Sequence, residues 1–304
     1  MTTAYAKKRR ILPLIAATIC NIILICNALS AQEYADNLTP LKGFSVTIDA
    51  GATYAGKTHA NFYSGVPENT NTIERVIHSE AYGEAIWNNL VDQGMISPSA
   101  IQTYKQLKVA EYANMRYSIT YQFGIGFRYD FEESNTALFA RFDYSKLTAK
   151  GGFNLYSGAS TSTLSNVNQY ISCGIWGTES RTYIDLGMSK AIPIGPILHF
   201  VADIGLNINH IRVQSNDMEI GGATYSILDI WGGEYPMMNS HSYEYYQTGI
   251  GFGVFVAPCL RLMLPGSMAA DLGVSCYYNK INLPKYNDFA PQFTLFVRFI
   301  LNNL

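Results

Sequence analysis

Charged residues are scarce in this chain. Lys, Arg, Asp and Glu make up 14% of the 304 residues, and the formal charge is −2, whereas about 25% is usual for a soluble domain. The chain instead has 22 Tyr, 15 Phe and 25 Gly. So little charge with so many aromatic residues argues against a disordered tail, a coiled coil or a surface for nucleic acid.

Cysteines and long hydrophobic runs are also few. Beyond residue 31 the cysteines are Cys173, Cys259 and Cys276, without a C-x-x-C pair, which argues against a disulfide framework or a cysteine metal site. No window after Gln32 holds eighteen apolar residues, so no further transmembrane helix is available. The sequence gives no indication of a metal or a cofactor.

The first 31 residues have the order of a secretory signal peptide. Lys7–Arg10 is basic, Ile11–Leu29 is apolar, and small residues precede a cleavage site near Ala31. The alternative is an uncleaved anchor helix over Ile11–Cys26, which the polar and helix-breaking residues in this stretch oppose. The predicted organisation is a signal peptide at 1–31, a periplasmic segment at 32–43 and one domain at 44–304.

The rest of the sequence alternates between apolar and polar residues. From Met115 to Phe131 the alternation runs without a break, which predicts a β-strand longer than those of ordinary globular proteins. We predict eight strands, and Val167–Gly177 either extends the fourth or adds a rim strand, which makes ten strands the alternative. The eight are Phe44–Tyr54, Met115–Phe131, Leu138–Ser145, Tyr183–Ser189, Leu198–Asn209, Gly249–Val256, Ala270–Tyr277 and Gln292–Phe299.

Two features indicate that the polar face of these strands points inward. Its glycines, such as Gly124 and Gly251, suit a crowded interior better than a solvated surface. The apolar face carries more Tyr and Phe than the interior of eight strands can hold. Apolar outside and polar inside is the arrangement of a transmembrane β-barrel. The alternative is a soluble, lipocalin-like barrel with an apolar cavity.

The predicted connections alternate in length. Transmembrane barrels have short periplasmic turns and long outer loops, so we expect both termini on the periplasmic side. A closed ring also satisfies every backbone group in lipid. The short connections are Glu132–Asn135, Ala191–Pro196 and Pro258–Ser267, and the long ones are Gly56–Asn114, Ala149–Ser180, Val213–Glu244 and Asn279–Pro291.

With these features the chain resembles the small outer-membrane β-barrel superfamily. This is the eight-stranded OmpA/OmpX-like and opacity-like group, and in particular the Bacteroidota outer-membrane β-barrel domain proteins. The resemblance rests on Ser30-Ala31-Gln32, the Tyr121–Tyr129 strand and the closing Phe293–Leu301 strand. It implies an all-β, closed antiparallel barrel in the outer membrane of a Gram-negative cell, with outer-membrane lipid and the barrel assembly machinery as partners. Functions within the group vary, so the resemblance mostly implies location.

Ten charged residues take the inward parity of the predicted strands. In a narrow barrel they must pair, because burying an isolated ion is very costly. We expect a charge network that plugs the lumen, and the alternative is a path for protons or small solutes. The predicted network is Asp49, Arg116, Arg128, Asp130, Arg141, Asp143, Asp185, Asp203, Asp271 and Arg298.

Two histidine clusters are candidates for catalysis. His199 and Asp203 share a strand face but lie about 13 Å apart along it. His241, with Ser240 and Glu244, has the residue types of an acyl-transfer site at the outer rim. Neither spacing brings the groups together by itself, so we expect no enzyme and no catalytic residue.

The first long connection has helical periodicity. Apolar residues recur at helical spacing over Asn71–Gln93, with Asn71 or Thr72 as the cap and Gly94 as the end. Ser97-Pro98 predicts a second helix over Ser99–Val109. This apolar stripe must be buried, so we expect it to pack across the barrel mouth, or to form a lid over a ligand site or a surface that docks a partner.

The sequence thus predicts an eight-stranded outer-membrane barrel with a plugged polar lumen. It would act as a membrane scaffold, or as a surface interaction or ligand-binding protein through its long outer loops, with the extracellular ligand left open. The alternative is a narrow channel for small solutes, and a less favoured one is a rim-located lipid- or peptide-cleaving enzyme.

Overall fold

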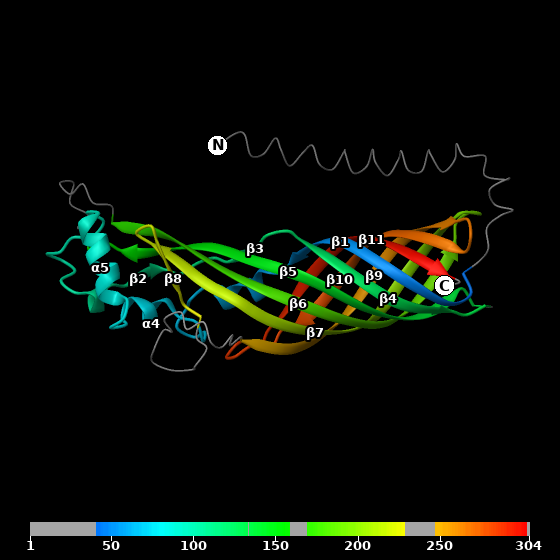
Figure 1. The fold of residues 1–304 in the computed structure, drawn as a ribbon, viewed down its shortest axis with the longest axis horizontal. Helices are drawn as coiled ribbons and strands as arrows, with labels where there is room; N and C mark the ends of the chain where they lie inside the picture. The colour runs from blue at the N-terminus through cyan, green and yellow to red at the C-terminus, as the bar shows by residue number, and fades with distance from the viewer. Residues whose placement is uncertain (1–40, 133, 159–168, 229–246, 303–304) are drawn as a thin grey trace, which may run out of the picture.

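The computed structural model describes residues 41–132, 134–158, 169–228 and 247–302. The predicted signal peptide at 1–31, most of the segment 32–43 and the His241 cluster lie outside the described residues. The described part is elongated, with a ring of strands at one end and short helices at the other (Figure 1). None of its helices is long and apolar enough to cross a membrane.

Eight antiparallel strands form the ring. Successive ring strands pair with each other, and the last one, β11, pairs with the first, β1. Every ring strand therefore has a partner on both sides, which satisfies its backbone groups. The ring contains eight strands, as predicted: β1 (Gly43–Ala55), β4 (Thr120–Asp130), β5 (Thr136–Tyr156), β6 (Tyr170–Pro193), β7 (Leu198–Ile220), β9 (Thr248–Leu264), β10 (Met268–Lys280) and β11 (Phe289–Asn302).

The period of two in the sequence becomes an alternation of exposure around the ring. On β4, Phe123 is 61% exposed, whereas its neighbour Gln122 is 5% exposed. The same alternation places Ile48 outside and Asp49 inside on β1. The polar face is therefore the inner face, and the alternative with an apolar interior is wrong.

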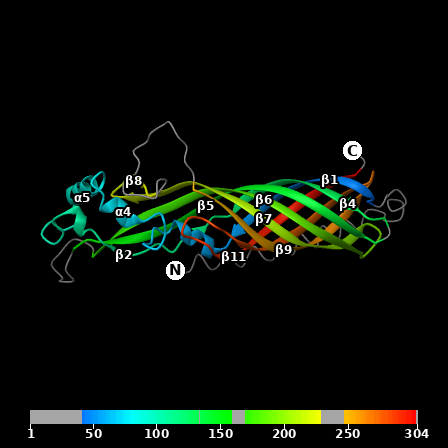
Figure 2. The ribbon, with the colours of Figure 1, turned by 90° about the horizontal axis from the view of Figure 1, so that it is seen from below.

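Three strands continue far beyond the ring. β5, β6 and β7 have 21, 24 and 23 residues, whereas β1 and β10 have 13 each. Their outer halves form a sheet that runs to the helical end of the molecule (Figures 1 and 2). We call this part the distal sheet. The short strands β2 (Val109–Glu111) and β3 (Arg116–Tyr117) pair with β5, and β8 (Ala223–Ser226) pairs with β7.

The distal sheet corrects two predicted loops. Residues 149–156 and 170–177, expected in a long loop, pair with each other across β5 and β6. The predicted loop Val213–Glu244 is described up to residue 228. Much of that part is also strand, because β7 continues to Ile220. From Tyr170 onward, the segment Val167–Gly177 is part of β6, the fourth ring strand. It adds no strand to the ring, so the ten-stranded alternative is wrong.

The predicted seventeen-residue strand is interrupted. β3 pairs Arg116 with Lys150, and β4 pairs Gln122 with Ser145. The six residue steps from Arg116 to Gln122 therefore match only five steps on β5. One extra residue reverses the face that the neighbouring side chains take. Tyr117 is accordingly buried and Arg116 exposed, opposite to the prediction. Arg116 is therefore not a lumen residue.

The first connection packs against the distal sheet and contains only short helices. These are α3 (Lys57–Ala60), η1 (Asn61–Tyr63), α4 (Ile73–Ile77), α5 (Gly83–Asp92) and η2 (Tyr104–Gln106). The predicted helix over Asn71–Gln93 is divided by a turn in which Ser79 accepts hydrogen bonds from Tyr82 and Gly83. The predicted helix over Ser99–Val109 is wrong, since only η2 forms there.

The apolar stripe of the first connection is buried. Ile77, Ile86 and Leu90 share one hydrophobic core with Leu147 of β5 and Ile175 of β6. Gly94, with φ of +66°, follows the end of α5 as expected of a glycine at this position. The first connection and the distal sheet together form a compact unit with its own core, which we call the head.

Candidate functional site

Ion pairs fill the interior of the ring. Arg298 Nε lies 2.7 Å from Asp49 Oδ1, and Arg298 Nη1 lies 2.8 Å from Asp203 Oδ2 and 3.4 Å from Asp271 Oδ2. Asp49 and Asp271 are the register partners of Arg298 on the two adjacent strands. One buried guanidinium therefore joins three carboxylates from three strands.

Three further arginines extend this network. Arg141 Nη2 lies 2.8 Å from Asp185 Oδ2, and its Nη1 lies 3.9 Å from Asp203 Oδ2. Arg261 contacts Asp271 at 2.7 Å, and Arg128 contacts Asp130 at 2.8 Å. With Asp143, which is also buried, nine of the ten predicted lumen charges lie inside the ring. Arg116 is the exception.

Sequence reasoning missed Arg261. The segment Pro258–Ser267 was predicted to be a turn, whereas β9 continues through it to Leu264. The signal was present, because Cys259, Arg261 and Met263 keep the parity of the inward residues before the proline. Pro258 lies within β9 and does not end it.

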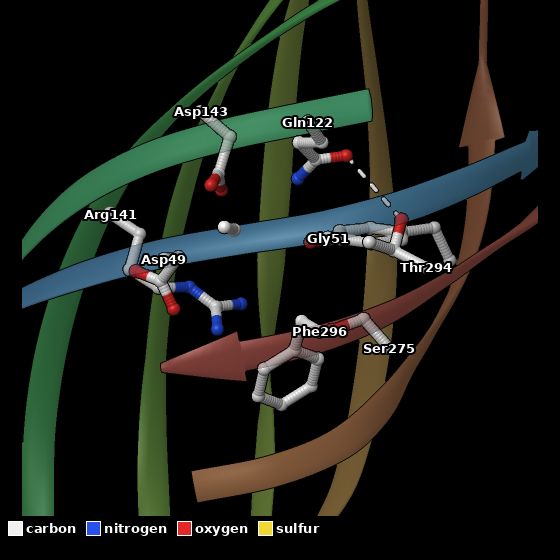
Figure 3. A pocket seen from close by; sticks show the side chains of 10 residues that line it. Asp49, Gly51, Gln122, Arg141, Asp143, Ser275, Thr294 and Phe296 are labelled. Atoms are coloured by element: carbon white, nitrogen blue, oxygen red, sulfur yellow. Dashed lines mark hydrogen bonds between the residues drawn. The ribbon is translucent and has the colours of Figure 1, made fainter. Parts of the chain in front are cut away.

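The interior leaves very little free space at mid-height. A cavity of about 10 Å³ lies among Asp49, Gln122, Arg141, Asp143 and Tyr277, and Figure 3 shows the Asp143 carboxylate pointing into this region. That volume holds about one water molecule. This cavity holds no larger solute, and the ion pairs around it favour a plugged lumen over the channel alternative.

A second buried ionic cluster lies where the first connection enters the ring. Arg181 Nε donates to Glu179 Oε1 at 2.5 Å, and the Tyr117 hydroxyl donates to the same oxygen at 3.0 Å. The Tyr63 hydroxyl donates to the other oxygen, Oε2. Burial and the Glu179 charge raise the pKa of Tyr63 well above its ordinary value, so Tyr63 stays a neutral donor. This cluster ties the first connection to β6.

His59, on α3, completes the contact between the first connection and the ring. Its Nε2 lies 3.1 Å from the carbonyl oxygen of Asp288, and its Nδ1 lies 3.5 Å from Arg181 Nη1. Burial, and then the charge of Arg181, lower the pKa of His59 to about 3. The imidazole of His59 is therefore neutral, with Nε2–H as the donor and Nδ1 facing Arg181.

We expect the contact of the first connection with the ring to weaken as the pH falls from 7 to 4. When the first connection is released, the His59 imidazole has its ordinary pKa of about 6.5, whereas in the buried position its pKa is about 3. Between these two pH values protonation therefore favours the released form. The rate of proteolysis within residues 56–119 should rise over this interval and rise less in His59→Gln. Equal pH dependence in both proteins would contradict this.

The described residues do not bring the remaining candidates together. Asp203 is bound by Arg298, and in the described part of the chain no hydrogen bond joins it to His199. Cys173, Cys259 and Cys276 are free thiols. The described residues include no group of three or more His, Cys, Asp or Glu side chains that could hold a metal ion.

The architecture defines a class: an eight-stranded antiparallel ring with apolar side chains outside and ion pairs inside. No protein-family model and no curated protein matches the sequence. Among solved structures the chain is similar to Neisserial surface protein A, at 11% identity and a TM-score of 0.38, over 87% of this chain and 100% of that one.

The chain is also similar to Ail, the attachment invasion locus protein of Yersinia pestis. The complex of Ail with the heparin analogue sucrose octasulfate matches at 8% identity and a TM-score of 0.32, over 86% of this chain and 99% of that one. TM-scores this low do not define a family for the chain.

Proposed function

We propose that this chain is an integral outer-membrane protein: a transmembrane β-barrel with a plugged lumen that presents the head to the cell exterior as a surface for interaction or ligand binding. The observation that supports this best is the apolar belt around the ring. Phe123, Leu206, Phe252 and Leu295, on four different strands, are each more than half exposed. A water-soluble protein rarely exposes an apolar surface of this extent, whereas lipid covers it.

The belt ends where the distal sheet begins. On β5 the outward residues Phe142 and Tyr144 are followed by Lys146, Thr148 and Lys150. On β6 the outward Leu186 and Ile184 are followed by Thr182 and Ser180. We therefore place the head outside the hydrocarbon layer on the outer side, and the short turns on the periplasmic side. Insertion would require the barrel assembly machinery.

The filled lumen favours a scaffold or surface role over transport. Buried ion pairs occupy the interior at mid-height, and the cavity among them has a volume of about 10 Å³. Above them, the first connection closes the mouth through the Tyr63–Glu179–Arg181 cluster. The part of the molecule able to meet other molecules is then the outer surface of the head.

The protein should fractionate with the outer membrane and be heat-modifiable. Without boiling, a closed barrel resists detergent and runs faster on a gel than the same protein after boiling. Fractionation followed by paired boiled and unboiled lanes tests this. A soluble periplasmic protein with unchanged mobility would contradict the proposal.

A further inference from the structure

The outer face of the distal sheet carries a groove between Lys150 and Trp176. These two residues are register partners on β5 and β6. The groove has a volume of about 280 Å³ and is lined by Lys150, Gly151, Gly174, Ile175 and Trp176. This is close to the lower end of the roughly 300–1,000 Å³ range of small-ligand pockets.

Gly174, which lines the groove, faces a second glycine across the strand pair in mid-strand. Gly152 and Gly174 are register partners in the row above Lys150 and Trp176. A Cβ atom at Gly174 would lie 3.8 Å from Trp176 Cζ3 and 3.9 Å from Glu219 Cβ, which are ordinary contacts. A larger residue would fit and would suit a strand better. Packing therefore does not require glycine at Gly174, whereas an open groove does.

The groove lies beside an uncompensated positive charge. Arg116 and Lys150 are register partners on β3 and β5, and both are exposed. Like charges directly opposite each other destabilise a sheet. Within the described residues no ion pair joins either side chain to a carboxylate. On the other side of Trp176 its register partner is Asp217, so an aromatic ring stands between two cations and a hydrogen-bond acceptor.

We propose that this groove binds a phosphorylated sugar, the saccharide headgroup of a glycolipid in the outer leaflet. The Trp176 ring would pack against the apolar face of the sugar ring. Lys150 and Arg116 would donate charge-assisted hydrogen bonds to the phosphate. Asp217 would accept hydrogen bonds from sugar hydroxyls. An aromatic wall, two cations and a carboxylate match a ligand with an apolar face, an anionic group and hydroxyls.

The height of the groove favours the membrane's own glycolipid as the source. Lys150 lies six residues beyond Tyr144, the last outward aromatic of the β5 belt. At about 3.3 Å per residue and a tilt of about 45°, the groove lies roughly 14 Å above the apolar boundary. Headgroup sugars occupy that layer. This inference rests on the proposed function, because it requires the distal sheet to stand outside the membrane.

Calorimetric titration of the purified protein in detergent micelles tests the proposal. The probes are a phosphorylated outer-membrane glycolipid, its released phosphorylated oligosaccharide, and the same oligosaccharide after phosphatase treatment. We expect both phosphorylated probes to bind, and removal of the phosphate or Trp176→Ala to weaken binding by about tenfold or more. Lys150→Ala should weaken binding and reduce its salt dependence.

Two variants keep the test independent of folding. Gly174→Val fills the groove without a close contact at its Cβ, so it should remain heat-modifiable and lose binding. Lys105→Ala removes an exposed cation of η2, on the first connection, and should bind as the wild type does. Binding of the glycolipid alone, or affinities within twofold in Trp176→Ala and Gly174→Val, would overturn the proposal. Failure of the proposed function would instead appear in the wild type as unchanged mobility on the gel.

Discussion

Arg298→Met is expected to destabilise the folded protein by about 3–5 kcal/mol, which is the cost of removing one partner from a buried ion pair. Arg298 is 2% exposed and contacts Asp49, Asp203 and Asp271. Without it, Asp49 retains no other ion pair among the described residues, and Asp203 and Asp271 retain one arginine each. Unfolding by urea in detergent measures the change in the free energy of unfolding, with the loss of the fast-running gel band as the readout.

The matched control for this substitution is Arg116→Met. Arg116 was predicted to belong to the same network, but it is exposed and takes part in none of these ion pairs. Its replacement should change stability by less than about 0.5 kcal/mol. Adding Asp49→Asn to Arg298→Met should recover part of the loss, because one stranded carboxylate is removed. Equal effects of Arg116→Met and Arg298→Met would refute the assignment of the network.

The sequence predicts the ring well because the two faces of each strand meet different surroundings. In the proposed membrane barrel, lipid would select apolar residues outside and the narrow interior would select glycine and paired charges, so a strict period of two results. From this parity Asp49 and Arg298 could be placed inside before their pairing was known. No local sequence pattern tells which strands lie opposite each other. The distances between these side chains, and the contact of one arginine with three carboxylates, could therefore not be predicted.

The head could not be predicted in the same way, because the apolar residues change faces where the ring gives way to the distal sheet. On β5 the apolar residues are outward at Phe142 and Tyr144, but inward at Leu147 and Phe153. The strand continues without a break, yet water now covers the outer face and a hydrophobic core lies inside. In the sequence this change looks like the end of a strand, which is why the predicted strand stopped at Ser145.

Local irregularities account for the remaining errors. The extra residue between β3 and β4 reverses the parity of Arg116 and Tyr117, and no residue in that stretch marks it. Pro258 lies within β9, where the pairing with β10 passes from Cys259 to Val256 and leaves the proline unpaired on that side. A proline has no N–H to donate, so a strand tolerates it at such a gap.

Gly177→Val should detach the first connection from the ring. A Cβ atom at Gly177 would overlap the Tyr63 ring, which is fully buried and held by Glu179. The aromatic side chain of Tyr63 cannot move aside without leaving this site, which corresponds to a strain of about 1–3 kcal/mol. We therefore expect proteolysis within residues 56–119 to become about 10- to 100-fold faster. Limited proteolysis of the protein in micelles measures this, with Gly174→Val on the outer face as the control.

The same variant separates the two barriers in the lumen. The ring strands keep their pairing in Gly177→Val, so the protein should remain heat-modifiable. The ion pairs around Arg298 and Arg141 lie below the site of the change and still fill the interior. Neither the wild type nor Gly177→Val should therefore carry a steady current in a planar bilayer. A current in the variant alone would mean that the first connection is the only seal, and that the charged interior conducts once it is removed.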